Sequence, residues 1–299
     1  MSPSLAVVTI VHGRHEHLVG QLRGLLSGSR APDLHVVVAM DDHSVDELVG
    51  GAGSARWPTR VVHVPRDSGR LPLAAARNRG VAEAIAAGCQ ELVLLDVDCI
   101  PDGDLLRRYS EVLQDGLDPP TGVIGPAHGA GPVVLCGEVR YLPASTGGDP
   151  TDPAWLAAAR PHPARPVVPP GAVRPDDDVT LFWSLSFAMT DTDWCAVGGF
   201  DESYVGYGGE DTDFGQRLRR AGGRLLWVGG AMAFHQHHPV QSPPVQHLED
   251  IVRNANLFAA RWGWWPMEGW LAEFQAAGLA ARSRDGRWHV VGPTVRLTG

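Results

Sequence analysis

Apolar runs and amphipathic stretches alternate along the first part of the chain. Each apolar run is short and bounded by polar or turn residues, which predicts a strand, whereas the stretches between them repeat apolar residues at helical spacing. The predicted strands are 5–11, 33–42, 60–64 and 91–98, and the predicted helices are 15–28 and 71–88. Because near-continuous apolar strands are buried on both faces, we expect an α/β fold with a mainly parallel central sheet, right-handed crossovers and helices on both faces.

This pattern stops in a proline-rich segment. Nine prolines lie between Pro143 and Asp178, and such a segment holds no long regular element beyond a short helix at 153–160. We expect a mobile loop or lid there. The elements expected afterwards are a buried strand pair or one bent strand over 179–190, a helix from near Glu210, and a strand over 224–235.

Composition narrows the classes of function. The chain has 299 residues, 44% of them hydrophobic, which suffices for one large α/β domain or two ordinary ones. Its formal net charge of −9 and pI near 5.8 give no overall basic field for nucleic acid or an anionic membrane, so partners are expected to be neutral or small. No lysine occurs in the sequence, which excludes a Walker phosphate loop and any Schiff-base mechanism.

Cysteine usage and hydropathy indicate the compartment. Cys89, Cys99, Cys136 and Cys195 show no Cys-x-x-Cys spacing and lie in or beside apolar segments, as buried reduced thiols do. The N-terminus lacks a basic leader with an apolar core, and no segment approaches 18 uninterrupted apolar residues. We therefore expect a cytoplasmic protein without a transmembrane segment, with surface association through aromatic residues left open.

A pair of carboxylates ends the last strand of the first half. Asp96 and Asp98 are alternate residues, so both can point to one side at the carboxyl edge of the sheet, where ligands bind in such folds. Hard ions such as Mg²⁺ and Mn²⁺ take oxygen ligands and keep positions open for phosphate, although the same acids could cap the helix that follows. His235, His237 and His238 form a second candidate ligand set, with His235 directly at a strand end.

The stretch "YVGYGGEDTDF" places two glycines before three acids. If a helix begins near Glu210, then Glu210, Asp211 and Asp213 lie in its first turn, where the helix dipole favours ionised carboxylates. Dipole compensation suffices for Asp213. Close approach of a sugar to bare backbone, beside a carboxylate base, would account for Gly208 and Gly209.

The joint order of these motifs resembles that of GT-A fold glycosyltransferases, family 2-like. The segment "GGFDESYVGYGGEDTDFGQRLRRAG" resembles the C-terminal half of galactosyltransferase-type members, whose hallmark is a Gly-Gly-Glu-Asp turn into a helix. "LLDVDCIP" is similar to their Asp-x-Asp metal motif, and "AMAFHQHH" to their late metal histidine. "GRHEHL" and "AAARNRG" are similar to segments near the nucleotide sugar. The resemblance covers about residues 5–240.

This resemblance implies transfer of a sugar from a nucleotide donor, with UDP-sugars preferred, to an acceptor hydroxyl. It implies a Mn²⁺ or Mg²⁺ ion on Asp98 and on His235 or His237. It further implies Asp211 as the general base, with Glu210 bonded to the donor sugar or the acceptor. The residues expected to bind the nucleotide sugar are His12, Gly13, Arg14, Asp41, Asp42, Arg77, Asn78, Asp96, Val97, Gly208 and Gly209.

The chain departs from the family pattern at two places. Ile10, Val11 and His12 stand where some members carry Pro-Phe-Arg, while Arg14 keeps a charge that can reach phosphate. Asp211 stands where retaining members typically carry Asn. Since only a carboxylate can take the proton of the acceptor, direct displacement with inversion is favoured.

The same resemblance divides the chain. We expect a catalytic domain over 1–240, with a nucleotide-binding half at 1–125, the proline-rich loop or lid at 143–178, and an acceptor and metal half at 179–240. Residues 241–299 are expected to form a tryptophan-rich extension packed on that domain. Its four clustered tryptophans, which could serve core packing, an acceptor platform or an oligomer contact, are Trp262, Trp264, Trp265 and Trp270.

Other classes of protein remain as alternatives. A sugar nucleotidyltransferase also uses metal carboxylates on an α/β sheet, but it needs a cationic triphosphate site, and the chain has no lysine and no glycine-rich basic loop after its first strand. A non-catalytic nucleotide-sugar-binding module would need no base. The absence of Gly-x-Gly-x-x-Gly in "VHGRHEH" disfavours a nicotinamide enzyme. The acceptor, whether glycan, lipid-linked sugar, peptide or small metabolite, is left open.

Overall fold

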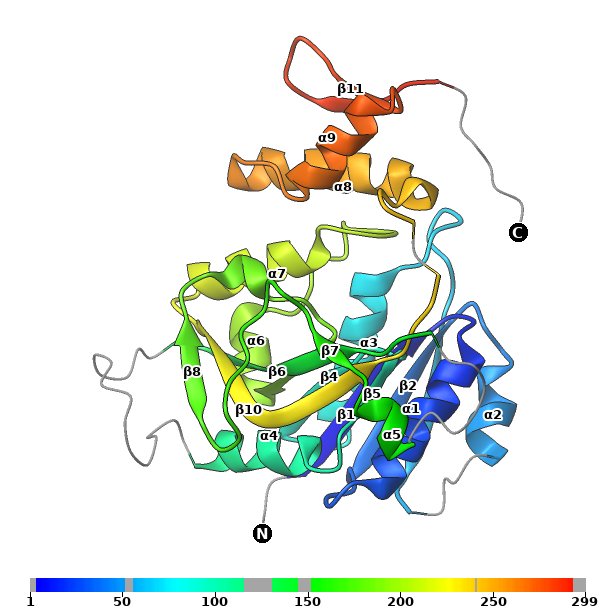
Figure 1. Ribbon diagram of the computed structural model, residues 1–299, viewed down its shortest axis with the longest axis vertical. Helices are drawn as coiled ribbons and strands as arrows, with labels where there is room; N and C mark the ends of the chain where they lie inside the picture. The colour runs from blue at the N-terminus through cyan, green and yellow to red at the C-terminus, as the bar shows by residue number, and fades with distance from the viewer. Residues whose placement is uncertain (1–3, 52–55, 116–130, 145–151, 240, 293–299) are drawn as a thin grey trace.

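The computed structural model describes residues 4–51, 56–115, 131–144, 152–239 and 241–292. In Figure 1 the strands form a layer between helices, and the C-terminal segment, in orange and red, stands on top of this body. The elements of the first half are β1 (Leu5–Val11), α1 (His15–Ser27), β2 (Leu34–Met40), α2 (Val45–Gly51), β3 (Thr59–Val64), α3 (Leu73–Ala86), β4 (Glu91–Leu95), β5 (Cys99–Pro101) and α4 (Leu105–Gln114). Those of the second half are β6 (Val133–Tyr141), α5 (Pro153–Leu156), β7 (Arg160–Pro161), β8 (Val173–Asp176), η1 (Val179–Leu181), β9 (Ser186–Thr190), α6 (Asp191–Val197), α7 (Glu210–Arg220), β10 (Arg224–His235), η2 (Val245–His247), α8 (Leu248–Trp262), α9 (Glu268–Ala276), β11 (Ala280–Arg282) and β12 (Trp288–Val290).

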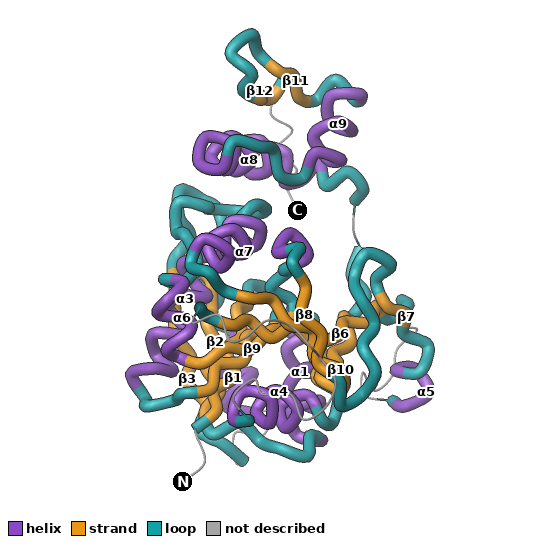
Figure 2. The backbone as a smooth tube through the Cα atoms, turned by 90° about the vertical axis from the view of Figure 1, so that its left-hand side faces the viewer, coloured by secondary structure: helices purple, strands orange, loops and turns teal. Residues whose placement is uncertain are grey.

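One long sheet runs through the molecule in the order β3-β2-β1-β4-β9-β6-β10-β5. Strands β3, β2, β1 and β4 pair in parallel, as do β6 and β10, whereas β9 pairs antiparallel with both β4 and β6. Short strands β7 and β8 add antiparallel to β6 and β10. The expected α/β fold with a mainly parallel sheet and helices on both faces is confirmed (Figure 2).

Alternate residues of β1 show why both faces are covered. Ala6 and Val8 pack with side chains from α3, α6 and α7, whereas Leu5 and Val7 pack with side chains from α1 and α4. None of the four is more than 2% exposed, as expected for a strand between two helical layers. On α3, a Cβ at Gly80 would lie 2.4 Å from Val8 Cγ1, so a glycine is needed for the helix to approach the sheet this closely.

The strand that carries the Asp-x-Asp motif is shorter than predicted. β4 ends at Leu95, because the backbone N–H of Asp96 donates to the carbonyl of Leu185 (3.0 Å) and that of Cys99 donates to the carbonyl of Asp96 (2.9 Å). These bonds turn the chain into β5, which pairs antiparallel with β10. The two acids therefore lie on a turn rather than on one face of a strand, and the argument from strand alternation was wrong here.

The stretch 179–190 contains one strand, not a strand pair or a single bent strand. Its first residues form the 3₁₀ helix η1, capped by Asp178, whose carboxylate accepts a hydrogen bond from the N–H of Thr180 (3.0 Å). Only β9 is extended. Phe182 and Phe187 are both fully buried, which gives the whole stretch the apolar character of a strand.

The proline-rich segment 143–178 holds no long regular element in its described part, as expected. It contains only α5, β7 and β8, while residues 145–151 lie outside the described residues. Its C-terminal part is anchored, since Arg108 of α4 donates to the carbonyls of Gly171 (2.7 Å) and Gly229 (3.1 Å). A lid function for this segment stays a prediction.

The C-terminal extension has a small core and docks on α7. The core of α8, α9 and β11 includes Ile251, Ala255 and Phe274. Two kinds of contact attach it to the body of the protein, one at the first turn of α7 and one at the loop before it. Asp250 of α8 also pairs with Arg70 at 2.6 Å.

At the first contact, Asp213 of α7 is fully buried and its Oδ1 accepts three hydrogen bonds. The donors are the hydroxyl of Tyr204 (3.2 Å), Arg261 Nη1 (2.9 Å) and Trp262 Nε1 (2.8 Å), the last two from α8. Asp213 therefore has a structural partner beyond the helix dipole.

At the second contact, the Asn254 amide Nδ2 donates to three carbonyl oxygens of the loop before α7. These belong to Val205 (3.3 Å), Tyr207 (3.2 Å) and Gly208 (2.7 Å). Asn254 is polar, yet it is fully buried on the apolar face of α8. The extension thus holds the backbone that leads into the first turn of α7.

The clustered tryptophans have separate places in this extension. Trp262 bonds to Asp213, and Trp265 and Trp270 border the small core. Trp264 remains 38% exposed beside Phe258, with the ring centroids 4.7 Å apart. Packing accounts for most of the cluster, and an oligomer contact stays a prediction.

The cysteines are free thiols, as expected, but they are not all buried. Cys89, Cys99 and Cys136 are buried, whereas Cys195 is exposed because α6 turns it toward solvent. Within the described ranges, no helix is both long and apolar enough to span a bilayer.

Candidate active site

Arg77 of α3 is a buried cation between two carboxylates. Its Nη2 lies 3.1 Å from Asp96 Oδ1, its Nη1 lies 3.5 Å from Glu210 Oε1, and its side chain is 5% exposed. The guanidinium also lies 5.2 Å from the ring centroid of Phe200. Arg77 is thus occupied by protein groups and fixes the orientation of both carboxylates, while direct contact with a nucleotide sugar stays a prediction.

Glu210 begins α7 at the position predicted for the helix start. Burial raises the pKa of Glu210 to about 7, the charge of Asp211 acts in the same direction, and Arg77 opposes it. Glu210 Oε2 is buried without a hydrogen-bond partner among the described residues. Because an unpaired buried polar atom costs free energy, this oxygen is a favourable place for a polar group of a ligand.

Asp211 has one hydrogen bond and no ion pair within the described part of the chain. Its Oδ2 accepts from the backbone N–H of Ser184 (3.1 Å), while Oδ1 has no partner. An ionised carboxylate with a free oxygen can accept a proton from a nearby hydroxyl.

The two glycines before these acids have reasons that involve no ligand. Gly208 and Gly209 have φ of 93° and 92°, a region that L side chains rarely adopt. A Cβ on Gly208 would also lie 2.8 Å from Met267 Sδ, and one on Gly209 would lie 3.2 Å from Tyr204 Cε1. Backbone conformation and packing require both glycines, so close approach of a sugar is not needed to explain them.

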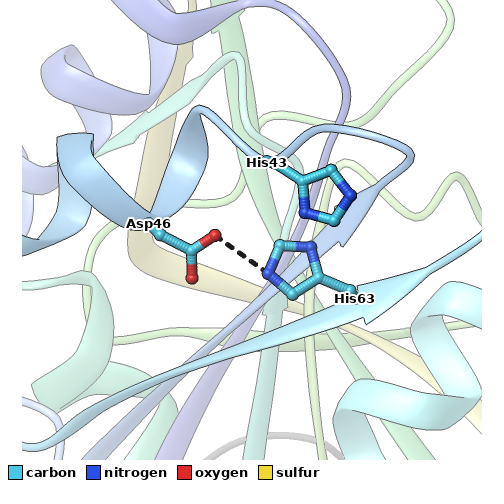
Figure 3. A group of neighbouring side chains, drawn as sticks. All are labelled: His43, Asp46 and His63. Carbon is cyan, nitrogen blue, oxygen red and sulfur yellow. Dashed lines mark ion pairs between the residues drawn. The ribbon is translucent and has the colours of Figure 1, made fainter.

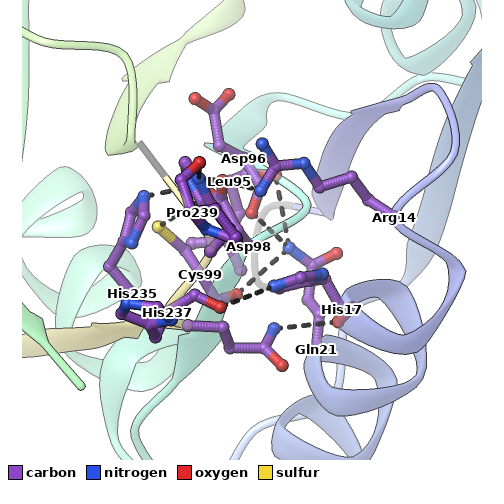
Figure 4. Close-up of polar contacts among 12 residues, drawn as sticks. Arg14, His17, Gln21, Leu95, Asp96, Asp98, Cys99, His235, His237 and Pro239 are labelled. Atoms are coloured by element: carbon purple, nitrogen blue, oxygen red, sulfur yellow. Dashed lines mark hydrogen bonds and ion pairs between the residues drawn. The ribbon is translucent and has the colours of Figure 1, made fainter. Parts of the chain in front are cut away.

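Asp98, on the turn between β4 and β5, faces imidazoles and a guanidinium (Figure 4). Its Oδ2 lies 3.5 Å from His235 Nε2 and 3.6 Å from His238 Nε2. Arg14 Nη1 lies 3.5 Å from the same oxygen. One ligand atom from each of Asp98, His235 and His238 falls within 4.8 Å of the others, so the three residues could hold one divalent ion.

His238 takes the place expected for His237 in this group. His237 is exposed and lies outside the group, whereas His235 was placed correctly. The chain leaves β10 after His235, and the backbone N–H of Gln236 donates to the carbonyl of Asp98 (2.7 Å). The order of side chains beyond the strand end is therefore set by this turn and not by strand alternation.

Two glutamines that the sequence analysis missed support the Asp96–Asp98 turn. Gln21 Nε2 donates to the carbonyls of Asp96 (2.8 Å) and Cys99 (3.2 Å), and Figure 4 shows its amide beneath the turn. Gln236 supports the turn through its backbone N–H, which donates to the carbonyl of Asp98, while its side-chain Nε2 donates to the carbonyl of His17 (3.0 Å). Gln21 is fully buried on the apolar face of α1. A glutamine among the apolar positions of a predicted helix is the sequence feature that could have identified it as a residue with a buried hydrogen-bonding role.

At the carboxyl end of β1, the nucleotide-binding candidates form a bonded loop. Asp42 Oδ2 accepts from the backbone N–H of Gly13 (2.8 Å) and lies 2.8 Å from His15 Nε2. Burial acts to raise the pKa of Asp42, but the bonds from His15 and Gly13 hold it below its usual range. Gly13 and Arg14 both have positive φ, 60° and 48°, which turns Arg14 toward Asp98.

Asp41 and His12 meet through an arginine that the sequence analysis did not select. Arg66 Nε lies 2.8 Å from Asp41 Oδ2, and its Nη2 lies 2.7 Å from His12 Nε2. His12 Nδ1 lies 2.6 Å from the carbonyl of Met40, so the ring is fixed from both sides. The structure brings His12 and Asp41 together at the ends of β1 and β2.

The side chains of Asn78 and Val97 both contact other parts of the protein. The Asn78 amide accepts from the N–H of Phe200 (2.8 Å) and donates to the carbonyl of Phe200 (2.9 Å) and to Glu202 Oε1 (2.8 Å). Val97 is 9% exposed and packs in the core with Val11. Asn78 bonds to the surrounding backbone and Val97 packs in the core, and contact of either residue with a nucleotide sugar stays a prediction.

Sequence comparisons point to one class of enzyme. The family model described as the N-terminal domain of galactosyltransferase matches residues 172–240, which include α7 and β10. Validoxylamine A glucosyltransferase of Streptomyces hygroscopicus subsp. limoneus is 28% identical over 225 residues, 74% of this chain and 49% of that protein. The chain spans about half the length of the curated relatives that it matches over most of its own length.

Solved structures give the same fold. Residues 1–349 of TarS from S. aureus match with a TM-score of 0.57 and 13% identity over 86% of this chain and 64% of that chain, and this protein is also known in complex with UDP-GlcNAc. GalNAc-T7, solved with UDP, GalNAc and Mn²⁺, matches with a TM-score of 0.51 and 16% identity over 86% of this chain and 50% of that chain. The chain therefore has the GT-A fold of these solved structures and resembles glycosyltransferases in sequence.

Proposed function

We propose that the chain transfers a sugar from a nucleoside-diphosphate donor, with a UDP-sugar preferred, to an acceptor hydroxyl, with inversion at the anomeric carbon. The observation that carries this proposal is the pairing of a carboxylate that has a free oxygen, Asp211, with the donor set of Asp98, His235 and His238. Asp96 lies within electrostatic range of both Asp98 and Asp211. The TarS and GalNAc-T7 complexes contain UDP-GlcNAc, or UDP with GalNAc, which favours the same donor class.

In this proposal the Asp98 group receives the diphosphate end of the donor. Asp98, His235 and His238 would hold Mn²⁺ or Mg²⁺, and such an ion would offset the charge that develops on the departing diphosphate. Arg14 lies beside the same carboxylate and adds positive charge at the mouth of this group. The candidate loop at Asp41 and Asp42 is assigned to the base and ribose of the nucleotide.

Asp211 is assigned to the acceptor. The acceptor oxygen attacks the anomeric carbon, the bond from that carbon to the diphosphate oxygen breaks, and the acceptor proton passes to Asp211 Oδ1. The Ser184 N–H holds Oδ2, while Oδ1 is buried without a hydrogen-bond partner among the described residues, so a bound acceptor hydroxyl would supply the missing partner. One displacement of this kind inverts the anomeric centre.

Glu210 is assigned to a hydroxyl of the donor sugar or the acceptor. Because burial raises its pKa, the carboxyl can carry a proton near neutral pH and donate a hydrogen bond through its unpartnered oxygen. Its other oxygen remains beside Arg77, which fixes the direction of the bond. Glu210 therefore contributes to binding and orientation, and Asp211 to proton transfer.

The test follows UDP release from a panel of UDP-sugars by the tag-free chain, with and without candidate acceptors. We expect release that stops with EDTA and returns with Mn²⁺. His238→Ala should raise the Mn²⁺ concentration that gives half-maximal UDP release by at least about tenfold. His237→Ala, its matched neighbour, should leave that concentration unchanged. Equal effects of the two substitutions would contradict the metal assignment, and absence of UDP release from every donor would favour a binding module.

A further inference from the structure

A second group of side chains that could hold a metal ion shares no residue with the candidate active site. His43 follows β2, Asp46 is in the first turn of α2, and His63 is on β3. One ligand atom from each lies within 4.8 Å of the others, the same limit that holds for the Asp98 group. Figure 3 shows the carboxylate of Asp46 and the ring of His43 beside the ring of His63.

The distances within this group suit a shared ion. Asp46 Oδ2 lies 2.9 Å from His63 Nε2. Two ligand atoms bound to one tetrahedral ion at about 2.0–2.1 Å are about 3.3 Å apart, so the pair has to open by only a few tenths of an ångström. The rings of His43 and His63 are stacked, with centroids 4.8 Å apart and 27° between planes, which brings a second imidazole to the same carboxylate.

The backbone holds all three residues in place without an ion. Val45 and Val49 of α2 are buried in a core with Val37 of β2, which fixes the helix that carries Asp46. The backbone N–H of Asp41 donates to the carbonyl of Val64 (2.9 Å), which ties the end of β2 to the end of β3. The group is therefore preorganised, and binding an ion would not require the loop to fold around it.

A surface ion pair alone is an incomplete account of this group. An exposed pair such as His63 with Asp46 contributes little to stability, and it gives no role to His43. Two imidazoles and one carboxylate from three separate backbone positions are instead the donor set of a three-ligand metal site with positions left for water.

We propose that His43, Asp46 and His63 bind a second divalent transition-metal ion, with Zn²⁺ as the probe. Imidazole donors favour borderline ions of this kind over Mg²⁺ and Ca²⁺, which require oxygen ligands. The site has the same kinds of donor as the Asp98 group but shares no residue with it, and it does not depend on the proposed transfer reaction. An ion there would link the loop after β2 to the edge strand β3.

The test counts Zn²⁺ bound per chain by equilibrium dialysis of the tag-free, metal-depleted protein at neutral pH. Zn²⁺ is also expected on the Asp98 group, so the wild type should bind two ions. The double variant His43→Gln/His63→Gln should bind one, and Asp98→Ala/His235→Ala should keep one. His289→Gln, an exposed histidine outside both groups, is the matched control and should bind two.

Three outcomes would overturn the proposal. They are undiminished binding by His43→Gln/His63→Gln, no binding by Asp98→Ala/His235→Ala, or an equal loss in His289→Gln. If the double variant misfolds by circular dichroism, Asp46→Asn replaces it and should weaken Zn²⁺ binding at this site by at least about tenfold. UDP release by His43→Gln/His63→Gln should match the wild type, so failure of the proposed transferase activity and failure of this site give different results.

Discussion

The first turn of α7 presents two carboxylates, two residues apart, in opposite situations. Asp213 is fully buried, and one of its oxygens accepts three hydrogen bonds, including one from the cationic Arg261. Asp211 is partly exposed and accepts a single bond, from a backbone N–H; each of the two carboxylates has one buried oxygen without a partner among the described residues. Both share the dipole of the same helix, so the dipole cannot decide their roles. Their hydrogen-bond partners differ: those of Asp213 join the extension to the body, whereas Asp211 has none from the extension among the described residues, and its role as base stays a proposal.

Substitution at Asp211 should have the largest effect on catalysis. Asp211→Asn keeps the bond from Ser184 but cannot take a proton, so the transfer rate should fall about 10²- to 10⁴-fold. The temperature of unfolding should change little. Initial rates with the best donor and acceptor, beside a thermal melt, check both expectations. Turnover like that of the wild type would end the assignment of Asp211 as base.

Asp213→Asn should show the reverse pattern. The loss of the negative charge beside Arg261 leaves buried donors poorly satisfied, which should lower the free energy of unfolding by about 1–3 kcal/mol. The rate per folded molecule should stay within a few-fold of the wild type. Urea unfolding and active-fraction-corrected kinetics measure the two quantities. An inactive variant with unchanged stability would reverse the roles given to the two carboxylates.

Glu210 should give a smaller effect that depends on pH. Burial raises its pKa from 4.5 to about 7, so the native state holds a proton that the unfolded chain releases. Stability should therefore fall as pH rises between these values and level off above them. Glu210→Gln removes this dependence, and the wild type should lose on the order of 1 kcal/mol relative to it across the window. A constant difference, from denaturant unfolding at several pH values, would show that native Glu210 is ionised throughout.

The sheet was predictable because burial on both faces leaves a direct trace in the sequence. Leu5 and Val7 face one helical layer and Ala6 and Val8 the other, so every position of β1 except Thr9 is apolar. The same signal failed at 179–190, where apolar side chains are buried from a 3₁₀ turn as well as from a strand. Apolar character reports burial, and it identifies a strand only when the backbone is also extended.

The candidate site was predictable in its residue types but not in its geometry. Asp98 and His235 were selected correctly as neighbours, but His238 replaced His237 because tertiary bonds from Gln236 shape the chain past the strand end. Asn78 matches a motif that resembles a donor-binding segment, yet its amide is used up by the backbone of Phe200. Which group a polar side chain bonds to depends on which residues the fold brings beside it, so the local sequence cannot predict that partner.

One amide reaches across the boundary between the two parts of the chain. The Asn254 side chain donates hydrogen bonds to three backbone carbonyls, those of Val205, Tyr207 and Gly208, shortly before the proposed base. A protein shortened to end after residue 239 would still contain every candidate catalytic and metal-binding side chain of the proposed active site. It would lack the hydrogen bonds from Asn254 that hold the loop before α7. If Asp211 is the base, the extension supports the loop that leads to it, and exchanging the extension between related proteins should change the position of that loop as well as the surface.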